Sequence, residues 1–174
     1  VGDPVGQGRT WIRSKSDDPA NLDVSALCQA LKAGQAVAGV GIFTDFEVDG
    51  KGVGSLVRPR GNQITAKVRV ACAAWGKPNL IQIFQDGNEV ASQKITKEEG
   101  IPLDQIYSFT IPTPSKDAWL AVVVRGEKPE GPWWAGMLPD TGALTNPIRL
   151  DVDGDGKWTS PLHAKVRTLS EPKP

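Results

Sequence analysis

QITAKVRVACAAW, at residues 63–75, alternates apolar and polar side chains along most of its length. The apolar row consists of Ile64, Ala66, Val68, Val70, Cys72 and Ala74, and the polar row of Thr65, Lys67 and Arg69. Successive side chains of an extended strand point to opposite faces, so this alternation separates one apolar face from one polar face. The stretch therefore predicts a β-strand that lies half in a core and half in solvent.

The same period of two recurs on both sides of this strand. IFTDFEV at 42–48 alternates and ends in Asp49-Gly50, a pair that favours a type I′ hairpin turn, and a second turn is expected at 86–88. WLAVVVR at 119–125 is apolar on both faces, which is typical of a central strand. Further strands are expected at 35–41, 80–85, 89–95, 105–111, 148–152 and 162–169, with an extended arm or edge strand at 8–15. Roughly seven to nine short strands joined by turns predict a mainly β protein, an immunoglobulin-like two-layer β-sandwich.

One segment near the start follows a helical period instead. Its apolar residues recur at i, i+3, i+4 and i+7, which places them on one side of a helix. They are Val24, Leu27, Cys28 and Leu31. Asn21 or Asp23 is the expected N-cap, and Gly34 lies where a glycine commonly ends a helix. The pattern therefore predicts one short N-terminal helix.

Length and composition indicate one folded domain. A chain of 174 residues is long enough for one sizeable core. We expect residues 1–34 to form an arm and the helix, packed on the same domain, residues 35–170 to form the sandwich, and residues 171–174 to form a frayed tail. Twenty Lys and Arg residues balance twenty Asp and Glu residues. The resulting zero net charge argues against nucleic acid or an anionic membrane as a partner, and no apolar run approaches the ~20 residues of a membrane span.

The chain contains two cysteines, Cys28 and Cys72, which are too few for a disulfide framework. Both fall on the apolar face of their predicted elements, where a free buried thiol is the simplest interpretation. A bridge between them is the alternative, and the sequence leaves it open.

Four stretches together resemble a known family. They are GQGRTWIR at 6–13, ALKAGQAVAGVG at 30–41, FEVDGKGVGS at 46–55 and LTNPIRLDVDGDGKW at 144–158. In this combination they are similar to the C-terminal β-sandwich of PHP-type (polymerase and histidinol phosphatase) metal-dependent phosphoesterases, in the carbaryl-hydrolase-like branch. The resemblance implies that the metal-binding catalytic half lies upstream and that the chain, which opens without Met or a signal peptide, is a fragment of a longer protein. The residues themselves do not indicate a cellular compartment, and the resemblance favours a secreted or periplasmic location.

The residues themselves do not supply a catalytic constellation. The single histidine, His163, is expected on the solvated face of the last strand, and one imidazole cannot hold a metal cluster. No GxSxG nucleophile elbow accompanies it. The paired carboxylates Glu98 and Glu99 stand in a loop-like segment, where charge usually means exposure. We therefore expect that this chain is not an enzyme on its own.

The acidic segment DVDGDG, at residues 151–156, is a candidate ligand-binding turn. Asp151, Asp153 and Asp155 alternate along it, and oxygen ligands at alternate positions beside glycine resemble the first half of a calcium-binding loop. Position twelve of that loop would be Leu162, where a bidentate Glu is expected, so the complete motif is absent. The segment predicts either a calcium site completed by ligands from elsewhere or a tight Asp-Gly hairpin turn.

Trp133 and Trp134 form the second candidate site, in the loop expected at 126–147. Adjacent tryptophans stack on sugar rings in carbohydrate-binding modules, but they also fold over the end of a sandwich or mediate docking to another domain. We favour docking, so the expected function is a non-catalytic C-terminal domain that packs on an upstream catalytic half or on a protein partner. The alternative is a carbohydrate-binding module that uses exposed Trp side chains and a structural calcium.

Overall fold

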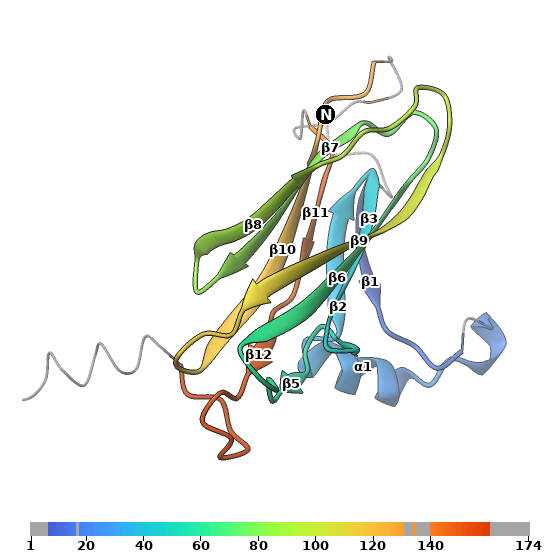
Figure 1. Ribbon diagram of the computed structural model, residues 1–174. Coiled ribbons are helices and arrows are strands. Elements are labelled where there is room, and N and C mark those ends of the chain that lie inside the picture. Colours follow the sequence, from blue (N-terminus) through green and yellow to red (C-terminus); the bar gives the residue numbers. More distant parts are fainter. Residues whose placement is uncertain (1–6, 17, 131–133, 135–139, 161–174) are drawn as a thin grey trace, which may run out of the picture.

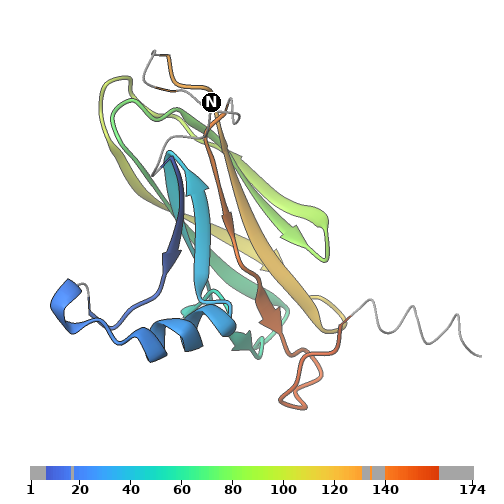
Figure 2. The ribbon, with the colours of Figure 1, turned by 180° about the vertical axis from the view of Figure 1, so that it is seen from behind.

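The computed structural model describes residues 7–16, 18–130, 134 and 140–160. The chain forms two β-sheets that pack face to face, with one short helix at one end of the sandwich (Figure 1, Figure 2). The predicted mainly β, two-layer sandwich with a short N-terminal helix is confirmed. The eight-stranded sheet contains β1 (Gly8–Ile12), β2 (Ala36–Val40), β5 (Leu56–Val57), β7 (Pro78–Gln85), β8 (Asn88–Lys94), β10 (Ala118–Gly126), β11 (Gly142–Thr145) and β12 (Ile148–Leu150). The four-stranded sheet contains β3 (Ile42–Val48), β4 (Lys51–Gly52), β6 (Gln63–Cys72) and β9 (Leu103–Pro112), and the helices are η1 (Pro19–Asn21) and α1 (Val24–Lys32).

β10 is the central strand of the larger sheet, as its doubly apolar sequence predicts. On one side it pairs with β7, which continues to the outer strand β8. On its other side it pairs with β11 and then with β12, so these two short strands lie along successive halves of β10. β11 leads on to β2 and the edge strand β1, while β5 pairs in parallel with β12. The smaller sheet runs in the order β4-β3-β6-β9.

The alternation in β6 has the predicted consequence. Its even-numbered residues from Ile64 to Val70 are at most 1% exposed, and its odd-numbered residues face solvent. The buried row meets β3 and β9 within its own sheet and the apolar inner face of the larger sheet across the core. The largest fully buried side chains are Phe46, Ile42, Ile64, Ile81, Ile83, Ile111, Leu120, Ile148 and Leu150.

Both predicted Asp-Gly turns are tight hairpins. Asp49 and Gly50 have φ values of 47° and 78°, and the flanking Val48 pairs with Lys51. Asp86 and Gly87 have φ values of 50° and 89°, and they join β7 to β8 in the same way. Two consecutive positive φ values define the type I′ turn, whose twist matches that of the paired strands.

The strand β11 corrects the expected long loop at 126–147. Its four residues, GALT, lie between β2 and β10, in the middle of the larger sheet. The segment is short and ends beside Asn146-Pro147, so it shows too little alternation to stand out from its turn-rich surroundings. The two-residue strands β4 and β5 were missed for the same reason, and the strand expected at 162–169 lies outside the described residues.

The helix α1 forms where its pattern predicts, with Asp23 as the N-cap that accepts a hydrogen bond from Ala26 N and with Gly34 at φ 76° after its end. The apolar stripe, however, does not enter the core. Val24 is 69% exposed, Leu31 is 50% exposed and Ala30 is the buried residue of the helix. Within the described part of the chain, no helix is long and apolar enough to cross a membrane.

Cys28 is exposed like Val24 and Leu31, whereas Leu27 is half-buried, so the expectation of a buried thiol was wrong for this residue. The helix lies at the end of the sandwich rather than over a sheet, and its stripe therefore has no core to enter (Figure 1). Cys72 is partly buried, and both cysteines are free.

The exposed stripe generates a stability prediction. The double substitution Val24→Gln and Leu31→Gln should change the free energy of unfolding by no more than about 0.5 kcal/mol, because both side chains lie largely in solvent. Leu120→Ala, at 0% exposure, should cost roughly 2–5 kcal/mol. Urea unfolding of the three proteins checks this, and a large loss in the glutamine variant would mean that the stripe packs against the domain in solution.

Candidate functional site

A groove of about 680 Å³ opens at one end of the sandwich, where β2 passes into β3. Gly41 is the single residue between these two strands, and its φ is 72°. A Cβ atom on Gly41 would lie 3.1 Å from the Trp75 ring and 2.9 Å from Thr141 Cγ2. The missing side chain thus lets the Trp75 indole lie directly against the backbone of the crossover.

The groove has aromatic walls. Trp75 lies in the turn after β6 and is 40% exposed, and its ring centroid is 5.5 Å from that of Trp134 at an interplanar angle of 51°. On the other wall Trp11, from the edge strand β1, contacts Phe43 of β3 edge to face at 5.2 Å. The groove also includes Leu103 and is therefore lined largely by apolar and aromatic surface.

Paired charges border the aromatic walls on the outer face of the smaller sheet. Arg69 donates hydrogen bonds of 2.7 and 2.6 Å to the two carboxylate oxygens of Asp104, which lines the groove. These hydrogen bonds lower the pKa of Asp104 and raise the pKa of Arg69. The Arg69 guanidinium also lies 5.8 Å from the centre of the Phe43 ring. The groove rim therefore offers a fixed guanidinium and carboxylate beside aromatic rings.

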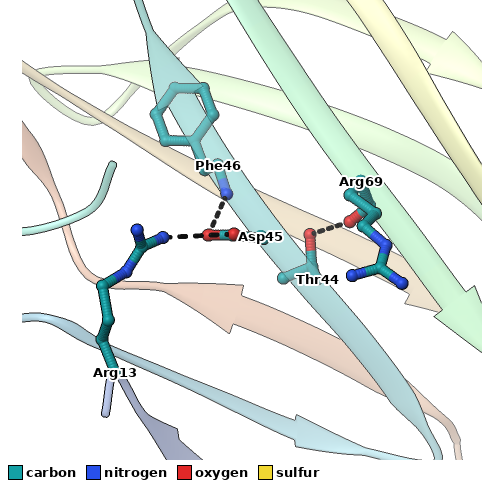
Figure 3. A network of polar contacts seen from close by, with 5 residues as sticks. All are labelled: Arg13, Thr44, Asp45, Phe46 and Arg69. Atoms are coloured by element: carbon teal, nitrogen blue, oxygen red, sulfur yellow. Dashed lines mark hydrogen bonds and ion pairs between the residues drawn. The ribbon is translucent and has the colours of Figure 1, made fainter. Parts of the chain in front are cut away.

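Two further polar contacts involve adjacent residues of β3, Asp45 on the outer face and Thr44 in the core (Figure 3). Arg13 Nη2 lies 3.3 Å from Asp45 Oδ2. The other carboxylate oxygen, Asp45 Oδ1, accepts a hydrogen bond from Phe46 N at 2.9 Å. Thr44 Oγ1 donates to the Arg69 carbonyl oxygen at 3.1 Å, which satisfies a hydroxyl that is buried in the core. The ion pairs are exposed to solvent and contribute little stability, but they orient the charged side chains on this face.

Cys72 forms part of the groove floor. Burial raises the pKa of its thiol, while a hydrogen bond with the Leu103 backbone and the charge of Lys97 act in the opposite direction. A thiol with a raised pKa is mostly protonated at neutral pH and is a poor nucleophile.

The acidic turn lies at the opposite end of the sandwich, directly after β12. Asp151 is 4% exposed, and its Oδ2 accepts a hydrogen bond from Gly156 N at 3.0 Å. The structure brings carboxylate oxygens of Asp151 and Asp153 within 4.8 Å of one another and of Asp117, which precedes β10. Asp155 is exposed and is not part of this cluster, and its Oδ1 accepts a hydrogen bond from Lys157 N at 2.7 Å.

The residues singled out from the sequence do not all lie in one site. Trp134 joins a site, but its neighbour Trp133 and the single histidine His163 lie outside the described residues. Glu98 and Glu99 lie in the loop between β8 and β9 and are exposed, as expected, and Glu99 lines a second pocket together with Trp75. The sequence pattern missed Trp75 and Asp117, because each reaches its partner through a tertiary contact across many intervening residues.

Comparison of the chain with protein-family models, with curated proteins and with solved structures found no match. The groove, the acidic cluster and the sequence itself are therefore the observations from which a function can be inferred.

Substitution of Gly41 should destabilise the protein more than the same substitution of Gly50, which serves as a matched control. Gly41→Ala should destabilise the protein by about 2–4 kcal/mol, because it adds left-handed backbone strain and a clash with Trp75 and Thr141. Gly50→Ala has the same backbone strain at φ 78° but nothing within 4 Å of the new methyl group, so it should cost about 1 kcal/mol. Chemical unfolding measures both, and near-UV circular dichroism should change in the Gly41 variant alone. Equal losses would contradict the packing of Trp75 on the crossover.

Proposed function

We propose that this chain is a non-catalytic accessory β-sandwich, the C-terminal domain of a larger PHP-type phosphoesterase-like protein, and that its aromatic groove packs on the catalytic half of that protein. The resemblance of the four sequence stretches supports the parent. The observation that carries the docking is the groove itself, in which Trp11, Phe43, Trp75 and Trp134 meet in a part of the surface flanked by charge.

The composition of the groove favours a protein surface as its occupant. Aromatic side chains and arginine are enriched at the centres of protein interfaces, where they supply large contact areas and few rotamers to immobilise. Trp75 is still 40% exposed, so a partner has apolar area left to bury. The Arg69–Asp104 pair lies at the rim, where charged groups set orientation and specificity more than affinity.

The position of the groove along the chain supports the upstream half as that occupant. Gln7 and Arg9, from the first described segment of the chain, both line it. A domain joined by a short linker to the N-terminal side of Gln7 would be held close to the groove. Such tethering raises the effective concentration of the partner, and even a modest contact surface then suffices for stable docking.

The proposed test separates the two halves. The upstream half of the same reading frame and this chain are produced as two polypeptides, and their association is measured by isothermal titration calorimetry. Trp75→Ala should weaken binding by at least about 30-fold, the loss typical of an interface hot spot. Leu144→Ala, which removes a side chain that is 52% exposed on the larger sheet, should change it by less than about threefold.

Two results would contradict the proposal. One is a reading frame without a His- and Asp-rich half upstream of Val1. The other is an association that Trp75→Ala and Leu144→Ala weaken equally, which would place the contact elsewhere.

Carbohydrate binding is the second candidate function, and the paired Trp75 and Trp134 rings favour it. Two indoles at 5.5 Å beside Asp104 and Arg9 offer stacking faces and hydrogen-bonding groups, which together recognise a pyranose ring. In that case a glycan array should show binding to the isolated chain, and Trp75→Ala should abolish it while Leu144→Ala retains it. An array without signal, together with association of the two halves, would favour docking.

A further inference from the structure

A buried carboxylate oxygen lies without a hydrogen-bond donor at the end of the sandwich away from the groove. Asp151 follows β12, and its backbone N–H donates to Val57 O at 2.8 Å, so its position is fixed. Its side chain is almost fully buried, yet Oδ1 accepts no hydrogen bond from the residues that the structure describes. An ionised oxygen without a partner is costly to bury, so the native site calls for a positive group at this atom.

The carboxylates beside Asp151 also call for a positive group at this place. Asp117, at 9% exposure, accepts hydrogen bonds from Val152 N at 2.9 Å and from Thr159 N at 2.8 Å, which hold its side chain beside the acidic turn. One carboxylate oxygen each of Asp117, Asp151 and Asp153 lies within 4.8 Å of the other two. None of the ion pairs within the described ranges involves these three residues.

One arginine lies near the turn but does not neutralise it. The guanidinium of Arg58 covers Gly154, so closely that a Cβ atom there would be 2.3 Å from its Nη2. Even so, Arg58 forms no ion pair within 4.0 Å with the described carboxylates, and the Asp151 Oδ1 atom stays without a hydrogen bond. The three converging carboxylates therefore have no ion-pair partner among the described residues.

We propose that Asp117, Asp151 and Asp153 bind one Ca²⁺ ion, and that this ion joins the turn after β12 to the segment between β9 and β10. Oxygen ligands at about 2.4 Å from Ca²⁺ lie up to about 4.8 Å apart, which matches the limit within which the three carboxylates meet. Mg²⁺ keeps its waters and requires stricter octahedral geometry, so this irregular loop suits Ca²⁺ better. The ligand set differs from the linear Asp151, Asp153 and Asp155 motif, because Asp117 takes the place of Asp155.

The bound ion would stabilise a particular junction. Besides the two contacts to Asp117, Trp158 Nε1 donates to Ala118 O at 3.0 Å, and Arg149 lies 5.5 Å from the centre of the Trp158 ring. The hydrogen bonds to Asp117 and Ala118 hold the turn onto the start of the central strand β10, and the Arg149 contact holds Trp158 against β12. The site lies far from the aromatic groove, so it does not depend on the proposed docking.

The test uses the whole chain after EDTA treatment, with CaCl₂ and MgCl₂ as the probes, by calorimetric titration and thermal melting. A site with three carboxylates and no bidentate Glu should bind Ca²⁺ with a Kd of about 10⁻⁴–10⁻³ M. Millimolar CaCl₂ should therefore raise the Tm, and MgCl₂ should raise it much less. A Tm and a titration that are indifferent to 10 mM CaCl₂, roughly ten times the weakest Kd expected, would overturn the proposal.

Three amide variants locate the ion. Asp117→Asn and Asp153→Asn should each weaken Ca²⁺ binding by at least about tenfold, whereas Asp155→Asn should change it by less than about threefold. Asp153 is exposed and an amide oxygen can still accept its hydrogen bond from Asp155 N, so Asp153→Asn keeps the proposal testable if Asp117→Asn fails to fold. Loss of binding in Asp155→Asn with retention in Asp153→Asn would overturn the proposed ligand set.

Discussion

β2 belongs to the larger sheet and β3 to the smaller one, and Gly41 alone separates them. Such a crossover requires the chain to leave one layer and enter the other within a single residue, which side chains would obstruct. A Cβ atom on Gly39 would lie 2.1 Å from the Ile42 carbonyl oxygen, and one on Gly126 would lie 2.8 Å from Ile42 Cδ1. The two sheets therefore approach closely at this end because glycine occupies each point of contact. The pairing of β3 with β6, and of β6 with β9, follows from where this crossover delivers the chain.

The same constraint shapes the groove. Where Gly39 and Gly41 lack side chains, the rings of Trp11 and Trp75 cover the backbone, at 3.0 and 3.1 Å from the positions where a Cβ would stand. The two indoles thus lie directly against the backbone of the crossover. A binding surface built on rigid elements loses little entropy when a partner arrives, which is the advantage of a preorganised site. The fold and the candidate interface consequently depend on one set of glycines.

Local sequence signals predicted most of this architecture. Alternation in β3, β6 and β9, the apolar run of β10 and the two Asp-Gly turns each express their structure within a few consecutive residues, so no tertiary information was needed. β11 could not be recognised, because a four-residue strand in the middle of a sheet is defined by its neighbours β2 and β10. The apolar period of α1 correctly indicated a helix. Periodicity does not say whether the apolar side of a helix meets a core, and most of this one does not.

The candidate sites were predictable only in part for the same physical reason. Asp151 and Asp153 stand close in sequence, and their alternate spacing by itself indicates an ion-binding turn. Asp117 is separated from them by β10, β11 and β12. The register of β10 against β12, in which Ala118 pairs with Leu150, brings the three carboxylates together. Trp75 likewise meets Trp134 only after the larger sheet has placed the two loops at one end. A linear motif therefore identifies the loop that holds a ligand, whereas the completing residue comes from the strand next to it, and a search for such sites should begin at the ends of paired strands.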